Sequence, residues 1–361
     1  MKVSIWCPVE YAADGLPTGW PAPGKCWDPA RGSESMARAF GLFDLAVERG
    51  FDMVTVAEHH YGYGSLVPSP VVMASALAQR YPEVRIGILG PILPLSNPVR
   101  VAEEVAMVDV LSGGRTVVGL FHGIPNEHLV YGVDPAETGD MFREALELVL
   151  RAWTEPETFG WEGRHYRFPT VSAWPRPLQR PHPPVVLAAT NAESGRLAAE
   201  RDCMVGIFGA VVPPEAAAEI AQQYREAAVE AGRSTTPEDV LYRARIYVAE
   251  TDQQAEQDVR EHAPGDLRSI IAPAPERAES AGKVLGTLFG GARGHRPLAP
   301  TPEFYGSAPT VAMQLQESSR RIGWGALDAR FTHPQLPHHK ARRSLELFAT
   351  EVLPRVRVAV P

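Results

Sequence analysis

The chain has 361 residues, of which 45% are hydrophobic and 22% are charged, and its formal net charge is −8, a composition typical of globular proteins. It has no run of Lys and Arg, so nucleic acid and anionic membrane surfaces are not expected as partners. No apolar stretch reaches membrane-spanning length, and the 3 cysteines are too widely spaced to imply a disulfide framework or a cysteine-based metal site. We therefore expect a cytoplasmic protein.

Eight short apolar segments predict β-strands. Most are apolar on both faces, as in a parallel sheet that is covered by helices. Eight β/α units with short turns favour a closed (β/α)8 TIM barrel over an open, doubly wound sheet. The predicted strands span 2–9, 52–57, 84–90, 115–121, 184–189, 203–209, 242–249 and 325–331.

Amphipathic segments between the strands predict helices. The clearest one has Asn97 as a capping residue, Pro98 at its first position, and Gly113 and Gly114 at its end. Two other segments, 140–153 and 339–353, show the same periodicity.

Three connections, after strands 1, 4 and 7, are too long for simple turns. Long insertions in compact domains are usually lids or disordered segments. Those after strands 1 and 7 leave from the C-terminal ends of strands, the face on which TIM barrels carry their active sites. The one after strand 4 has room for a small hairpin. We expect a single barrel domain, 1–361, with insertions at about 10–35, 159–184 and 261–304.

The strand predicted at 52–57 leads into Glu58, His59 and His60. Burying charge is costly, so three such residues at a strand end indicate a catalytic site rather than a chance loop contact. Neighbouring strand residues point to opposite sides, so Glu58 and His60 should share one direction and His59 should take the other. A metal site would need further ligands from elsewhere, and no HxxxH or HxH pattern is present, so we predict none.

Asn191, Glu193 and Ser194 lie at the start of the helix predicted after 184–189. The free N–H groups and the dipole of a helix start favour an anion, such as the phosphate of a cofactor. Plain N-capping would also explain Asn191 or Ser194. A similar start follows at Gly306, Ser307 and Thr310.

Two further candidates for cofactor binding lie at other strand ends. Gly90 ends the strand predicted at 84–90, where a glycine permits a flat ring to approach the backbone or merely permits a bend. His122 follows the strand predicted at 115–121 and could contact a phosphate or a substrate, or could be a surface histidine.

Taken together, these segments resemble the bacterial luciferase-like, flavin-dependent monooxygenase family. The order and spacing of the matching blocks are more specific than any one of them, whereas the insertions at 10–35 and 261–304 show no clear family pattern. The blocks are GFDMVTVAEHHY, LPLSNPVRVAEEVAMVDVLSGGR, PVVLAATNAESGRLAAE, YGSAPTVAMQL and LPHHKARRSLELFATEVLPRV.

The resemblance implies a barrel that uses reduced FMN and O2 to oxygenate an apolar or aromatic organic substrate through a C4a-peroxyflavin. His59 matches the family's catalytic histidine, which stabilises that adduct and moves protons near it. Glu193 and Ser194 match the loop on the phosphate side of the cofactor. Phe121 and His122 stand where the luciferases carry a reactive cysteine and a phosphate-binding arginine, so light emission from a long-chain aldehyde is not expected.

The sequence also bears on partners. No nicotinamide-binding GxGxxG motif follows a strand, so reduced flavin should come from a separate NAD(P)H:flavin reductase. The resemblance implies a homodimer. It also implies a role in secondary metabolism, because the Ala-, Pro- and Arg-rich composition is typical of high-GC bacteria, in which such enzymes often tailor secondary metabolites. Three alternatives remain open: a deazaflavin (F420)-dependent hydride-transfer oxidoreductase on the same barrel, a non-catalytic flavin-binding protein and a metal-dependent hydrolase.

Overall fold

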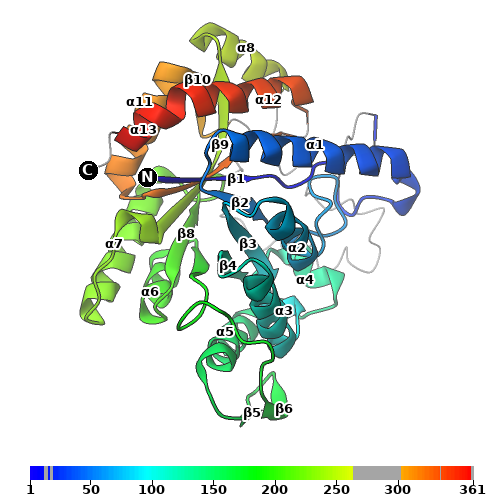
Figure 1. Ribbon diagram of the computed structural model, residues 1–361, viewed down its shortest axis with the longest axis vertical. Helices are drawn as coiled ribbons and strands as arrows, with labels where there is room; N and C mark the ends of the chain where they lie inside the picture. The colour runs from blue at the N-terminus through cyan, green and yellow to red at the C-terminus, as the bar shows by residue number, and fades with distance from the viewer. Residues whose placement is uncertain (12–14, 17–18, 263–301, 334, 359–361) are drawn as a thin grey trace. The chain divides into compact units, whose positions relative to one another are not determined.

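The computed structural model describes residues 1–361 except 12–14, 17–18, 263–301, 334 and 359–361 (Figure 1). All eight predicted strands are present, and their order is that of a closed parallel barrel, which confirms the (β/α)8 prediction. The strands are β1 (Lys2–Trp6), β2 (Met53–Val56), β3 (Arg85–Ile92), β4 (Thr116–Phe121), β7 (Val185–Ala189), β8 (Met204–Phe208), β9 (Val240–Ala249) and β11 (Ala326–Arg330).

The boundary signals of the clearest predicted helix are confirmed. The Asn97 side chain accepts hydrogen bonds from two backbone N–H groups at 3.0 and 3.2 Å, and Pro98 is the first helical residue. Gly113 and Gly114 both have positive φ just beyond the helix end. The helices of the described residues are α1 (Pro29–Glu48), α2 (Pro70–Arg80), α3 (Pro98–Leu111), α4 (Pro125–Val130), α5 (Thr138–Thr154), α6 (Ala192–Glu200), α7 (Pro214–Glu230), α8 (Asp252–His262), α11 (Ala308–Ile322), α12 (His338–Leu347) and α13 (Leu353–Val358).

The three predicted insertions have different outcomes. The first, 10–35, was drawn too long, because Asp28 caps α1 by accepting a hydrogen bond from Arg31 N at 2.9 Å. The second contains the expected hairpin, formed by the antiparallel strands β5 (Phe159–Glu162) and β6 (Arg167–Val171). Most of the third, 263–301, lies outside the described residues. β10 (Phe304–Ser307), a strand that the sequence did not predict, begins at the last residue of this insertion.

Internal contacts divide the chain into two compact units. Unit 1 comprises residues 1–53, 61–66 and 189–361, and unit 2 comprises 54–60 and 67–188. In unit 1, β9 pairs with β8, β10 and β11, and β11 pairs with β1, all in parallel. In unit 2, β4 pairs with β3 and β7, and helices α2 and α3 contact each other beside β3 and β4 (Figure 1).

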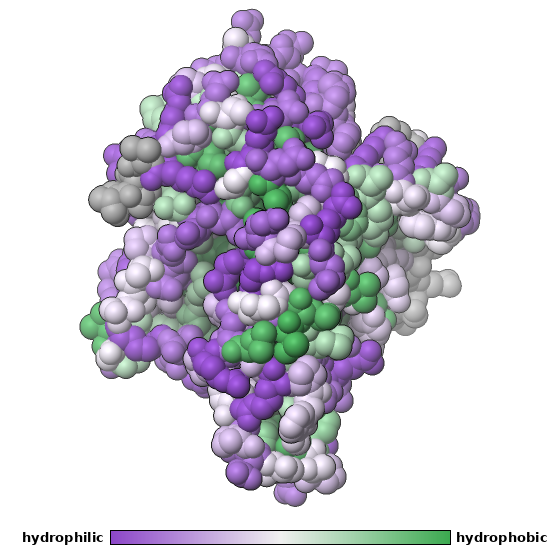
Figure 2. Space-filling view, viewed as in Figure 1, coloured by the Kyte–Doolittle hydropathy of each residue, from purple (hydrophilic) through white to green (hydrophobic). Residues whose placement is uncertain are grey.

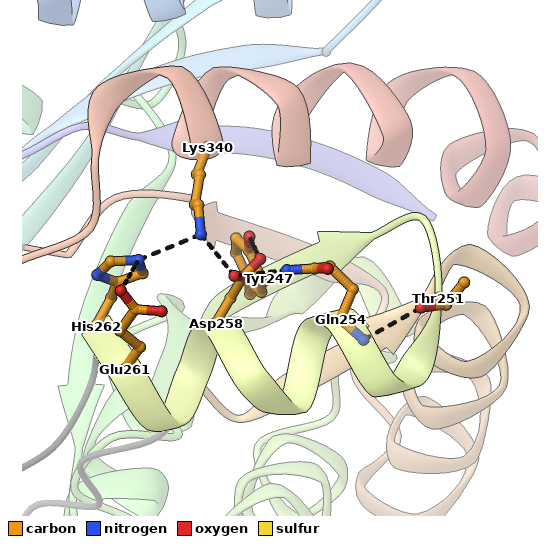
Figure 3. Close-up of polar contacts among 7 residues, drawn as sticks. All are labelled: Tyr247, Thr251, Gln254, Asp258, Glu261, His262 and Lys340. Carbon is orange, nitrogen blue, oxygen red and sulfur yellow. Dashed lines mark hydrogen bonds and ion pairs between the residues drawn. The ribbon is translucent and has the colours of Figure 1, made fainter.

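In unit 1, a polar cluster joins α8 to α12 (Figure 3). The Asp258 carboxylate accepts hydrogen bonds from Lys340 Nζ at 2.6 Å, from Tyr247 Oη at 2.6 Å and from Gln254 Nε2 at 2.8 Å. Lys340 Nζ also lies 3.3 Å from His262 Nε2. These donors lower the pKa of Asp258 although burial acts in the opposite direction, so the carboxylate stays ionised and fixes the two helices to each other.

A small, partly open pocket lies beside this cluster, lined by residues that include Arg245, His262, Arg330 and His333. Burial, together with the smaller effects of the charges of Arg330 and Arg245, lowers the pKa of His333 from its ordinary value of 6.5 to about 4. His333 is therefore neutral in the folded protein at physiological pH.

The pKa of His333 predicts a pH-dependent loss of stability. Below about pH 6.5 the unfolded chain takes up a proton that the folded chain does not bind until about pH 4, so unfolding becomes easier as pH falls through this window. The loss amounts to at most about 3 kcal/mol. In His333→Asn, which keeps an acceptor for the Gln335 N–H group, this part of the loss should vanish. The measurement is the free energy of urea unfolding between about pH 4 and pH 6.5. His339→Asn, at an exposed histidine, is the control and should show the pH dependence of wild type. Identical pH profiles for wild type and His333→Asn would contradict the expectation.

Candidate active site

The residues after β2 separate into two directions, as the strand alternation predicted. Glu58 and His60 are both buried, and His60 Nε2 lies 2.9 Å from Glu58 Oε1. The other carboxylate oxygen of Glu58 accepts a hydrogen bond from Ile92 N at 3.1 Å. Because both of its oxygens are engaged, Glu58 joins the ends of β2 and β3 and fixes the ring of His60.

His59 points the other way and forms a second pair. Its Nδ1 lies 2.7 Å from Glu127 Oε1, and the side chain of His59 is 40% exposed, whereas that of Glu127 is only 4% exposed. Glu127 Oε2 accepts a hydrogen bond from Ile124 N at 3.1 Å. The carboxylate is thus held by the first turn of α4 and by the histidine.

This arrangement determines which ring nitrogen of His59 is available for chemistry. An ionised carboxylate can only accept hydrogen bonds, so Nδ1 of His59 carries the proton that points at Glu127. Nε2, on the other side of the half-exposed ring, can then accept a proton and return it. A histidine oriented by a buried carboxylate is a common arrangement for general acid–base catalysis. We call His59 and Glu127 the dyad.

The end of β3 explains Gly90 without a ligand. Gly90 has φ of +143°, and a Cβ at this position would lie 3.1 Å from the backbone N of Glu58. The pairing of β3 with β4 also changes register between Leu89 and Ile92. Glycine is therefore required here because the backbone after β2 approaches closely. Of the two explanations given for Gly90 from the sequence, this is the bend in the strand. A cofactor contact at Gly90 stays a prediction.

Phe121 and His122 follow each other at the end of β4. The ring of Phe121 lies over Gly119, where a Cβ would come within 2.7 Å of it. Burial lowers the pKa of His122, and the neighbouring His128 lowers it further. His122 Nε2 lies 2.9 Å from Thr138 Oγ1. The predicted role of His122 in cofactor binding stays a prediction.

In unit 1, the start of α6 is capped by its own side chains. Asn191 Oδ1 accepts a hydrogen bond from Ser194 N at 2.9 Å, and Ser194 Oγ accepts one from Asn191 N at 3.2 Å. Glu193 lies in the first turn between them. These bonds are the plain capping that the sequence allowed as an explanation. Phosphate binding by Asn191, Glu193 and Ser194 stays a prediction.

Sequence reasoning missed Glu127, although it singled out His59. The signal that could have found it is the short pattern from Ile124 to Glu127, with Pro125 at the first helical position and a glutamate at the third. Among the residues that the structure describes, no group of three or more His, Cys, Asp or Glu side chains is arranged to hold a metal ion. No helix in the described ranges is long and apolar enough to cross a membrane.

The family of the chain follows from a match over most of its length. Residues 1–298 match the model of the family described as luciferase-like monooxygenase. The chain belongs to this family. This membership confirms the family resemblance, and the AEHH, SNP and AES blocks lie within the matched residues. It also places the dyad in a family of monooxygenases.

Three proteins illustrate this relationship. The oxygenase component of a flavin-dependent trigonelline monooxygenase from Acinetobacter baylyi is 27% identical over 218 residues, which cover 60% of each chain. The monooxygenase RslO1 from Streptomyces bottropensis has 27% identity and a TM-score of 0.76 over 98% of this chain and 99% of its own. The oxygenating constituent of 3,6-diketocamphane monooxygenase from Pseudomonas putida, solved with FMN, is 20% identical with a TM-score of 0.71 over 99% of both chains, which supports the fold alone.

The curated relatives are matched over only part of their length. The alignments span 52%, 60% and 43% of the first three of them. The family match and the structural likeness establish the family and the fold. The activity, the substrate and the partners of this chain are proposed below.

Proposed function

We propose that this chain is the oxygenase component of a two-component flavin-dependent monooxygenase. It binds reduced FMN and uses O2 to place one oxygen atom on an apolar or aromatic organic substrate, and the other oxygen atom leaves as water. The observation that carries this proposal is the dyad, in which Glu127 holds the half-exposed His59 with Nε2 directed away from it. A role in secondary metabolism and a cytoplasmic location are part of the same proposal.

The residues present fit the cofactor's chemistry. Reduced FMN, when bound, supplies the electrons and the ring carbon to which O2 adds. The chain contributes a place to hold a proton, at Nε2 of His59, beside the reacting groups. Glu58 and His60 fix the backbone from which His59 projects. Asn191, Glu193 and Ser194 at the start of α6 would hold the phosphate, with Gly90 and His122 as further contacts.

One prediction tests the phosphate contact. Ser194→Ala should weaken the binding of FMN modestly, by about 1 kcal/mol, because one hydroxyl contact is lost. The same hydroxyl caps α6, so the melting temperature should also fall slightly. Fluorescence titration with FMN measures the affinity, and Ser234→Ala, which lies in an irregular segment, is the matched control. An FMN affinity equal to that of wild type would place the phosphate elsewhere.

The proposed partners rest on separate arguments. The chain lacks a nicotinamide-binding motif, so a flavin reductase should deliver reduced FMN, and activity with NAD(P)H and FMN alone would contradict this.

A homodimer is supported by exposed hydrophobic side chains on the neighbouring helices α2 and α3, a face on which Figure 2 shows hydrophobic residues gathered. Analytical ultracentrifugation of the purified protein tests the dimer. The exposed residues are Val72, Met107, Val110 and Leu111.

The decisive experiment is rapid mixing of the protein and reduced FMN with O2, prepared without air. We expect a flavin spectrum that is neither that of reduced FMN nor that of oxidised FMN and that outlasts the reaction of free flavin. Immediate return of oxidised FMN with one equivalent of hydrogen peroxide would contradict the proposal. The same titration with reduced F420 separates the rival oxidoreductase, because tight binding and hydride transfer without O2 would favour that alternative.

A further inference from the structure

An aromatic side chain that is not part of the dyad contacts His60, the residue next to His59. Tyr131 follows directly after α4, its side chain is 60% exposed, and the sequence analysis assigned it no role. Its ring stands perpendicular to the ring of His60, with centroids 5.4 Å apart and planes at 88°. His60 is itself buried and fixed by Glu58. Tyr131 is therefore an exposed ring with a defined orientation rather than a loose surface side chain.

Its position relative to the dyad follows from α4. Glu127 lies in α4 and Tyr131 follows its last residue directly, so one short segment of the chain supplies both side chains. Glu127 contacts His59, and Tyr131 contacts His60, the next residue of the chain. These two contacts bring α4 and the residue after it against consecutive residues that follow β2, so the tyrosine ring lies against the short segment that carries His59.

The exposed ring is suited to contact another flat molecule. His60 can cover at most one face of Tyr131, so at least one face is left for other contacts. Aromatic rings prefer offset stacking or edge-to-face contact with another ring, which adds to the gain from apolar burial. Ile124, at the other end of α4, is also exposed and adds apolar surface. No such preference exists for a saturated ring or chain of the same size.

We propose that Tyr131 forms the stacking surface for a planar aromatic ring of the substrate and so selects planar over saturated substrates. This inference rests on the proposed function, because it assigns Tyr131 to the substrate of the reaction that His59 serves. It narrows the substrate class from apolar or aromatic molecules to those with a flat ring.

The test is a binding measurement that needs no turnover. The probes are naphthol and its fully saturated counterpart decahydronaphthol, which share a carbon skeleton and a hydroxyl group and differ in planarity. Calorimetric titration of wild type should show tighter binding of naphthol. In Tyr131→Leu, which keeps an apolar side chain without a ring, naphthol should bind about tenfold more weakly, whereas decahydronaphthol should bind as before.

Controls keep the result specific. Tyr131→Phe should retain naphthol binding, because the ring is kept and only the hydroxyl is lost. Trp174→Leu removes an exposed aromatic ring elsewhere in unit 2 and should leave both affinities unchanged. Failure of naphthol to bind wild type, or equal naphthol affinity in wild type and Tyr131→Leu, would overturn the proposal.

Two further measurements separate this inference from the proposed function. If Tyr131→Leu weakens FMN binding and leaves naphthol binding unchanged, the ring serves the cofactor and the inference is wrong. If naphthol binding depends on Tyr131 but no flavin-dependent use of O2 is found, the stacking surface stands and the monooxygenase proposal fails.

Discussion

Replacing His59 by glutamine is expected to separate flavin oxidation from product formation. Glutamine keeps a hydrogen-bond donor for the buried Glu127 but cannot move a proton near neutral pH. Loss of general acid–base catalysis typically costs between about 10²-fold and 10⁴-fold in rate. Oxygenated product should fall by this factor, while reduced FMN is still consumed and its electrons appear as hydrogen peroxide. The affinity for FMN should be unchanged, because His59 is not among the residues proposed to hold it.

Product and hydrogen peroxide are to be measured in the same reaction, with a limiting amount of reduced FMN. His339→Gln, an exposed histidine on α12, is the matched control and should behave as wild type. The alanine variant of His59 should be uncoupled as well, but it also leaves the Glu127 carboxylate without its His59 partner and is expected to be less stable. An unchanged product yield in His59→Gln would remove His59 from the mechanism.

The strands could be predicted because their physical signal is local. A strand of a parallel barrel is apolar on both faces, so β3, β4 and β7 appear as short continuous runs of Val, Ile, Leu and Ala. Boundaries were less certain. The first strand was predicted to run to residue 9 and ends at Trp6, because the apolar residues that follow are buried without joining the ladder.

Elements with weak local signals were misjudged. β10 was missed because it has only four residues, and its Gly306 and Ser307 were recognised only as residues at a helix start. That helix does follow them directly, at Ala308. This strand exists because it pairs with β9, which is a tertiary contact. The sequence that precedes the strand has no local pattern that predicts the pairing. In the same way, α1 begins inside the predicted first insertion, because the cap at Asp28 lies among Gly, Pro and Trp residues that favour a loop.

In the candidate site, too, the local features could be predicted and the tertiary contacts could not. The direction of His59 relative to Glu58 and His60 follows from strand alternation and could be predicted from the sequence. Its partner Glu127 could not be paired with it, because 68 residues separate them and the pairing depends on how α4 packs against the end of β2. A glutamate at the third position of a short helix looks like ordinary capping. Only the structure shows that one of its oxygens caps and the other holds His59.

Because the two oxygens of Glu127 have separate partners, Glu127→Gln is the sharpest test of the dyad. A glutamine has a single acceptor oxygen in place of two, yet both Ile124 N and His59 Nδ1 donate to Glu127. If the oxygen caps α4, the amide N–H₂ faces His59, and the ring must place its proton on Nε2. If the oxygen faces His59, the Ile124 N–H group meets another donor. The first result forces His59 into the other tautomer, whereas the second weakens the start of α4, and in both the side chain keeps nearly the same size.

We expect the kcat of Glu127→Gln to fall between about 10²-fold and 10⁴-fold, as for other histidines held in the wrong tautomer, with little change in KM. Nitrogen NMR of the His59 ring should show the proton moved from Nδ1 to Nε2, a change that general loosening of α4 would not produce. Glu157→Gln, an exposed glutamate of the same unit, is the matched control. A variant with normal kcat would mean that Glu127 only caps α4, and His59 would then have to act without a positioning residue.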